Sequence, residues 1–213
     1  MLFIARSGHS WFSDCSSLKE IVVPPSVNSI EAGAFNGCSS LTRITIPSSV
    51  TSIEDYAFSG CSSLKEIVVP SSVTKIEEFA FNDCSSFIQI NIPSSVTFIG
   101  PFCFSGCSSL NAIKLDCQIK AIKSYTFSNC SSLTEVTIPS SVTSIETSAF
   151  NNCSSLRQVT IPSSVTSIGG YAFGGCSSLK PMSLPNVISV GENAFEEFSQ
   201  SKEMEWKWKI RSS

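Results

Sequence analysis

A Cys-Ser-Ser tripeptide recurs at a spacing of 23 residues along the chain, and this period constrains the fold more than any other feature. The recurring cysteines are Cys15, Cys38, Cys61, Cys84, Cys107, Cys130, Cys153 and Cys176. Aligned on them, the unit reads C-S-S-L-x-x-I-x-I-P-S-S-V-T-x-I-x-x-x-A-F-x-G. One such unit is too short to bury its own apolar positions, whereas stacked units cover one another. The repeat therefore predicts a solenoid.

The period predicts one elongated domain over residues 1–213. We expect a partial N-terminal coil at 1–14, eight repeats at 15–197 and a degenerate C-terminal capping strand at 198–213. In that last segment Met204, Trp206, Trp208 and Ile210 alternate with charged residues. Charges on the final strand would protect the open end of the solenoid from association with other strands.

The residue chemistry changes several times within one repeat. With the cysteine as position 1, the alternating x-I-x-I segment at positions 6–9 predicts a short strand that ends at a proline. The V-T-x-I segment predicts a second short strand or turn, and x-x-x-A-F predicts one helical or 3₁₀ turn. Gly, Asn or Asp at position 23 indicates a left-handed residue. Position 21 is a predicted core position, because it holds Phe35, Phe58, Phe81, Phe104, Phe127, Phe150, Phe173 and Phe195.

Composition and charge argue against several classes of partner. The net charge is −3 and no basic block stands out, so nucleic acid is not an expected partner. No stretch approaches the roughly 18 consecutive apolar residues of a membrane span. The four-residue apolar run at the start is too short for the core of an export signal, which usually has about 7–15 residues.

The cysteines invite a disulfide framework, but a solenoid of this length already has a core, and its ladder thiols would point the same way. We therefore expect buried free thiols that act as small apolar residues. Cys103 replaces the alanine of position 20 and is expected in the core. Cys117 replaces a turn serine in an irregular repeat that has Asp116 in place of proline, which makes it the predicted exposed thiol.

Catalytic and metal-binding patterns are not found. The chain has no C-x-x-C pair, and its one histidine, His9, has no second imidazole to join it. His9-Ser10 does not stand in a nucleophile elbow, and no phosphate-binding glycine loop occurs. We expect no enzymatic activity, no cofactor and no metal.

The motif L-x-x-I-x-I-P-x-x-V-x-x-I-x-x-x-A-F-x-x-C resembles the BspA-like, or Treponema-type, leucine-rich repeats over residues 12–206. The resemblance implies an α/β repeat solenoid, right-handed and curved, with short parallel strands on its concave face. It also implies a non-enzymatic protein of the cell surface, associated with adhesion to host cells and matrix proteins. Many members carry a signal sequence or anchor, and this sequence shows neither, so a cytoplasmic location stays open.

Two surfaces are candidates for binding a protein. Positions 6 and 8 should point outward from the concave strands and vary between repeats. The candidates there are Glu66, Val68, Gln89, Asn91, Lys114, Glu135 and Thr137. Position 19 holds the aromatic residues Tyr56, Phe79, Phe102 and Tyr125 in four consecutive repeats. These form either an exposed stripe that anchors an interface or the margin of the core.

The preferred hypothesis is an adhesin-like surface module, a monomer that binds a host-cell or matrix protein. One alternative is an intracellular scaffold of the same architecture. Another is a structural or antigenic repeat array without a single ligand. Glycans or oxidised thiols on the native protein would exclude the cytosol, and weak, unselective binding would favour the array.

Overall fold

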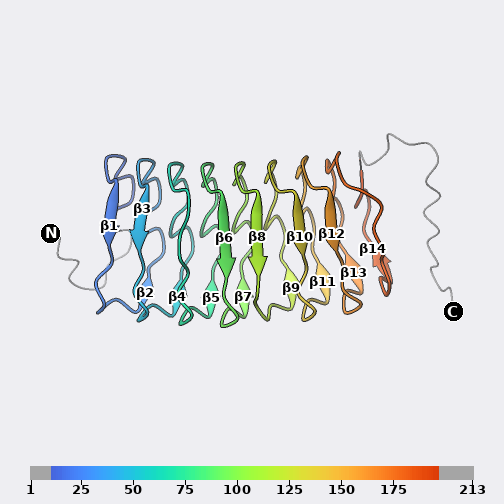
Figure 1. The fold of residues 1–213 in the computed structure, drawn as a ribbon, viewed down its shortest axis with the longest axis horizontal. Helices are drawn as coiled ribbons and strands as arrows, with labels where there is room; N and C mark the ends of the chain where they lie inside the picture. Colours follow the sequence, from blue (N-terminus) through green and yellow to red (C-terminus); the bar gives the residue numbers. More distant parts are fainter. Residues whose placement is uncertain (1–10, 197–213) are drawn as a thin grey trace.

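The structure is a computed structural model that describes residues 11–196, and these residues form a parallel β-solenoid (Figure 1). We number its coils one to eight from the cysteines at which they begin. The described strands are β1 (Glu20–Val22), β2 (Ser29–Ile30), β3 (Arg43–Thr45), β4 (Ser52–Ile53), β5 (Lys75–Ile76), β6 (Gln89–Ile92), β7 (Phe98–Ile99), β8 (Ala112–Leu115), β9 (Ala121–Ile122), β10 (Glu135–Thr137), β11 (Ser144–Ile145), β12 (Gln158–Thr160), β13 (Ser167–Ile168) and β14 (Ser189–Val190). The expected partial coil at 1–14 and capping strand at 198–213 lie mainly or wholly outside the described residues.

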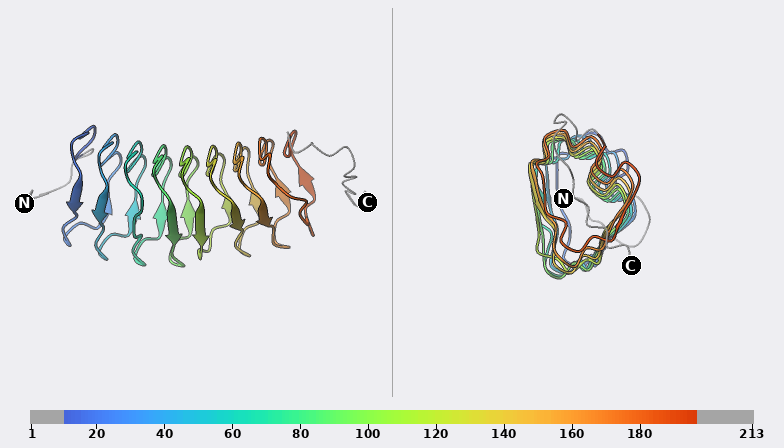
Figure 2. Two further views of the ribbon diagram at one scale, coloured as in Figure 1. Left: turned by 45° about the horizontal axis from the view of Figure 1, so that its top comes forward. Right: turned by 90° about the vertical axis from the view of Figure 1, so that its right-hand side faces the viewer.

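The strands fall into two classes that occupy different sides of each coil. The longer strands arise from x-I-x-I and pair in parallel as β1–β3, β6–β8 and β10–β12. The two-residue strands arise from V-T-x-I and form two four-stranded sheets, β2-β4-β5-β7 and β9-β11-β13-β14. Both predicted strands of the repeat are therefore confirmed. We call the side with the longer strands, together with residues 66–69 of coil three, the long-strand face (Figures 1 and 2).

Pairing in register places equal repeat positions beside one another. Ile21 lies opposite Ile44, and Ile53 lies opposite both Ile30 and Ile76. Viewed along the solenoid, the coils superimpose on one closed outline (Figure 2). This stacking produces uninterrupted columns of identical side chains.

The predicted helical turn at x-x-x-A-F is wrong, because the described residues contain no helix. Instead, backbone amides alternate between local turns and the next coil. In coil two the amides of Tyr56 and Phe58 donate to the carbonyls of Glu78 and Ala80 in coil three, whereas the amide of Ala57 closes a turn on Glu54. Tyr56 has a φ of 57°, in the left-handed region, which interrupts any right-handed helical run.

Position 23 is left-handed in every coil where it is described, as predicted from its residue types. The φ angles include 71° at Gly60, 55° at Asp83 and 61° at Asn129. Glycine, asparagine and aspartate tolerate this conformation best, which explains their alternation at one position.

The core contains a continuous column of stacked phenylalanine rings. Phe58, Phe81 and Phe104 are fully buried, with ring centroids 5.3 Å and 5.5 Å apart and nearly parallel planes. The column runs from Phe12 to Phe195 through every coil. The prediction that position 21 lies in the core is thus confirmed.

Candidate functional site

The long-strand face presents an alternating pattern of buried and exposed residues, because successive strand residues point to opposite sides. Position 7 is buried or half-buried, and Ile44 and Ile67 are only 7% and 6% exposed. Positions 6 and 8 lie on the surface. The predicted residues found exposed there are Glu66, Val68, Gln89, Asn91, Lys114, Glu135 and Thr137. Their outward orientation was predictable from the period of two.

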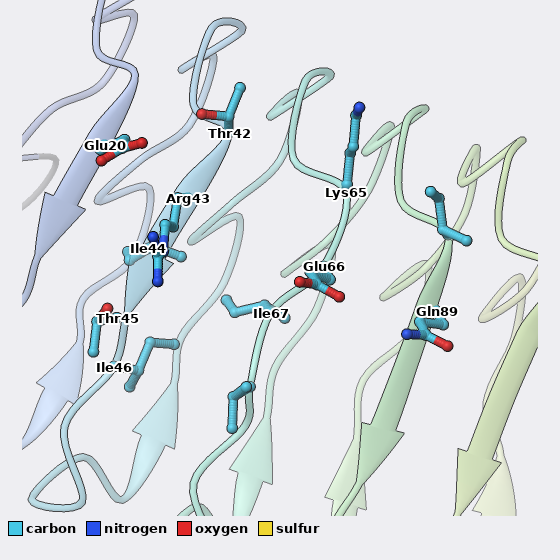
Figure 3. A pocket seen from close by; sticks show the side chains of 12 residues that line it. Glu20, Thr42, Arg43, Ile44, Thr45, Ile46, Lys65, Glu66, Ile67 and Gln89 are labelled. Carbon is cyan, nitrogen blue, oxygen red and sulfur yellow. The ribbon is translucent and has the colours of Figure 1, made fainter.

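A shallow groove of about 880 Å³ lies on this face over coils one to four (Figure 3). Its charged lining residues are Glu20, Arg43, Lys65 and Glu66. Val68 and Ile88 add apolar surface, with Val68 81% exposed. A groove that mixes both charge signs with exposed apolar side chains suits a polypeptide better than a small molecule, which requires a more enclosed pocket.

The groove coincides with an interruption of the sheet that sequence reasoning missed. In coil three, residues 66–69 form no strand and make no backbone hydrogen bond to either neighbouring coil within residues 11–196. On one side lies the pair β1–β3, and on the other the pair β6–β8. The backbone N–H and C=O groups of residues 66–69 therefore have no backbone partner in the neighbouring coils within residues 11–196.

The surface continues beyond this groove toward the C-terminal coils. A second groove of about 480 Å³ is lined by residues 66–68, 89–91 and 112–114, so it joins the first through coil three. Lys114 forms an exposed ion pair with Asp116 at 2.7 Å at its far edge. The predicted residues Glu135 and Thr137 lie on β10, beyond both grooves.

The position-19 aromatics form a second column on the short-strand side of the coils. The ring centroids of Tyr56, Phe79, Phe102 and Tyr125 are separated by 4.6, 4.6 and 4.5 Å along the series. Tyr56 is 45% exposed, whereas the other three rings are half-buried. We call these four residues the aromatic ladder. It is neither a fully exposed stripe nor a part of the buried core.

The seven repeated cysteines from Cys38 to Cys176 are free, buried and hydrogen-bonded. Cys61 Sγ donates to the carbonyl oxygen of Phe35, 26 residues earlier, at 3.1 Å, and the same bond recurs in every coil from two to eight. The Phe35 carbonyl also accepts the backbone N–H of Cys38. The expected small apolar role is thus incomplete, because the thiol also donates a hydrogen bond across the stack of coils.

The prediction of an exposed thiol at Cys117 is wrong, because this side chain is 1% exposed. In the regular coils the proline carbonyl accepts a turn hydrogen bond, as Pro47 does from the N–H of Val50. Coil five has Asp116 instead, lacks that bond, and bends at 117 so that the thiol turns inward. Cys103, expected in the core, is fully buried.

Burial raises the pKa of the six repeated cysteines from Cys38 to Cys153, and for Cys38 the value rises to about 11. We expect a thiol reagent such as iodoacetamide at neutral pH to modify Cys15, which is partly exposed, much faster than Cys107 or Cys117. Mass spectrometry of the labelled peptides, native and in denaturant, measures this difference. Fast native labelling of Cys117 would contradict its burial.

No group of three His, Cys, Asp or Glu side chains among residues 11–196 is arranged to hold a metal ion. His9 lies outside this part of the chain. No helix long and apolar enough to cross a bilayer occurs within the same residues.

A family model described as BspA type leucine-rich repeat region (6 copies) matches residues 6–134 and 120–212. The chain belongs to the BspA-type leucine-rich repeat family. The resemblance in the repeat motif is thereby confirmed. No curated protein sequence matches the chain.

Solved structures of the family share the fold. A leucine-rich repeat protein from Bacteroides ovatus is 32% identical with a TM-score of 0.81, and the match covers 86% of this chain and 48% of that one. A leucine-rich repeat protein from Eubacterium ventriosum is 28% identical with a TM-score of 0.69, covering 89% and 61%. The T. pallidum leucine-rich repeat protein is 31% identical with a TM-score of 0.59, covering 81% and 70%. This chain thus spans about half of the B. ovatus protein.

Proposed function

We propose that the long-strand face of this leucine-rich repeat protein binds an extended segment of a host-cell or matrix protein, in the manner of a surface adhesin. The groove over the unpaired residues 66–69 carries the proposal. Its lining combines both charge signs with exposed apolar side chains at Val68 and Ile88, beside a segment whose backbone pairs with neither neighbouring coil. No catalytic constellation is needed for this function.

The location and the partner class rest on the family. A leucine-rich cell surface protein from Faecalibacterium prausnitzii is 27% identical, with a TM-score of 0.52, and the match covers 89% of this chain and 65% of that one. We extend the description 'cell surface protein' from that relative to this chain. The handedness, the curvature and the monomeric state expected from the sequence remain predictions.

Binding to immobilised matrix proteins and to host-type cells tests the proposal. The triple variant Glu66→Lys, Asn91→Ala, Lys114→Glu changes three exposed residues of the two grooves while it conserves net charge. We expect saturable binding by the wild type and a loss of at least about tenfold in the variant, since interfaces concentrate their binding energy in a few residues. Surface plasmon resonance gives the affinities.

A charge-matched control keeps this test specific. Lys120→Glu with Glu192→Lys alters exposed residues away from the grooves and also conserves net charge. We expect the control to bind like the wild type. If the wild type binds nothing, or if triple variant and control behave alike, the proposal fails. Partners captured only from a cell lysate would favour an intracellular scaffold.

A further inference from the structure

The aromatic ladder ends at Tyr56, and on the side away from Phe79 no ring of residues 11–196 stacks on it. The ladder position in the preceding coil is Gly33, whose N–H donates to the carbonyl of Asp55 at 2.8 Å. Coil one therefore lies directly beside coil two at this point, yet contributes no side chain to the stack. The exposure of Tyr56, 45%, agrees with an open ring face.

The opposite end of the aromatic ladder, at Tyr125, has different neighbouring side chains and charges. Beyond Tyr125 the ladder position in coil six is Ser148, which is buried. The charges beside it are neutralised, because Lys123 Nζ lies 3.0 Å from Glu146 Oε1. Among the described residues, the Tyr56 end is therefore the one end of the aromatic ladder that combines an open ring face with carboxylates that are not neutralised.

Carboxylates surround the Tyr56 end of the ladder without matching cations. Positions 17 and 18 of coils one to three hold Glu31, Glu54, Asp55, Glu77 and Glu78, and Lys75 is the one cation on the adjoining strands of these coils. None of these carboxylates has an ion pair within residues 11–196. The pKa of Glu77 is raised, first by burial and then by Glu54 and Asp55, so the carboxylates repel one another.

Two of these carboxylates are held in place by hydrogen bonds. Glu54 Oε1 accepts the hydroxyls of Ser52 at 2.6 Å and Ser29 at 3.3 Å, and Asp55 Oδ1 accepts the N–H of Glu78 at 3.0 Å. The second oxygen of each has no partner among residues 11–196. Each fixed carboxylate therefore keeps one oxygen for an external donor.

We propose that the open face of Tyr56, with Glu31, Glu54 and Asp55, binds an arginine side chain of a partner protein. A planar guanidinium stacks flat on an aromatic ring and donates its in-plane N–H groups to carboxylates at the same time, whereas an ammonium group has no plane to stack. The guanidinium would extend the ladder by one step over Gly33. This surface lies outside the long-strand grooves, so the proposal stands independently of the adhesin function.

Synthetic peptides test it directly. The probe is acetyl-Gly-Ser-Arg-Gly-Ser-Arg-Gly-Ser-amide, compared by titration calorimetry at low ionic strength with versions that carry lysine or citrulline in place of arginine. Citrulline keeps the planar shape but lacks the charge. We expect the arginine peptide to bind about tenfold tighter than either analogue.

Three variants locate the site. Gly33→Tyr should abolish binding by covering the ring, and the backbone accepts it because Gly33 has a φ of 64° while Tyr56 and Tyr125 adopt 57° and 59°. Tyr56→Leu should weaken binding about tenfold. Tyr171→Leu is the matched control, because Tyr171 is an exposed position-19 tyrosine preceded by Gly169 and Gly170 instead of carboxylates.

The results separate the possibilities. Loss of binding in both Gly33→Tyr and Tyr56→Leu, with Tyr171→Leu unchanged, supports the site. Equal binding of arginine and lysine peptides, equal effects of Tyr56→Leu and Tyr171→Leu, or unimpaired binding by Gly33→Tyr overturns it. Circular dichroism confirms that each variant is folded.

Discussion

The protein is expected to lose its fold steeply as the pH rises from about 9 to about 10. Burial raises the pKa of eight thiols above the ordinary value of 9.0: Cys38, Cys61, Cys84, Cys103, Cys107, Cys117, Cys130 and Cys153. The folded chain therefore keeps eight protons that the unfolded chain releases, and stability falls as pH rises. Each thiol contributes a loss of about 1.4 kcal/mol per pH unit above its unfolded pKa, so the eight together lose roughly 11 kcal/mol. Typical domains have only about 5–15 kcal/mol in total.

Urea unfolding at several pH values between about 8 and 10, under reducing conditions, measures this slope. The double variant Cys107→Ala, Cys130→Ala removes two of the eight protons, so its slope should be about three-quarters of the wild-type slope. Its absolute stability is expected to be lower, because two Sγ–H donors are lost. A wild-type stability that does not change over this pH range would show that the thiols are not buried as described.

Replacing Phe81 by alanine is expected to destabilise the protein by about 3–5 kcal/mol. Phe81 is fully buried, and its ring stacks on Phe58 at 5.3 Å, Phe104 at 5.5 Å and Phe87 at 5.7 Å. Alanine leaves a cavity between three rings whose own positions are fixed by the coils above and below. The free energy of unfolding in urea measures the loss.

Phe81→Leu should cost less, because leucine fills most of the same space. Tyr171→Ala, at an exposed aromatic residue, should change stability by less than about 1 kcal/mol. A loss below about 1 kcal/mol for Phe81→Ala would mean that the phenylalanine column is not the core.

Where the repeat period alone decides a feature, the sequence was sufficient to predict it. Identical residues at equal positions must stack, so the Phe81 column, the burial of Cys103 and the outward orientation of Glu66 follow from the register. The local path of the turn does not follow in the same way. An Ala-Phe pair is compatible with a helical turn, and it is the left-handed φ at Tyr56, which sequence alone does not mark, that excludes it.

The candidate groove could not be predicted, because the local sequence does not encode it. Residues 18–24 and 64–70 are both Leu-Lys-Glu-Ile-Val-Val-Pro, yet the first contains β1 and the second contains no strand. The difference arises from the neighbouring coils rather than from the segment itself. The prediction that the Cys117 thiol is exposed failed for a related reason. The loss of one proline redirects the turn, and the new path of that turn depends on tertiary contacts.

The regularity of the cross-coil bonds bears on how such a chain can change length during evolution. The Sγ–H bonds join residues 26 apart, and threonine hydroxyls such as those of Thr74 and Thr97 bond to carbonyls 23 residues earlier. Gain or loss of whole 23-residue coils leaves each of these groups with an equivalent partner, whereas deletion of part of a coil does not. Unequal recombination between repeats can therefore lengthen or shorten the exposed face stepwise without any redesign of the interior.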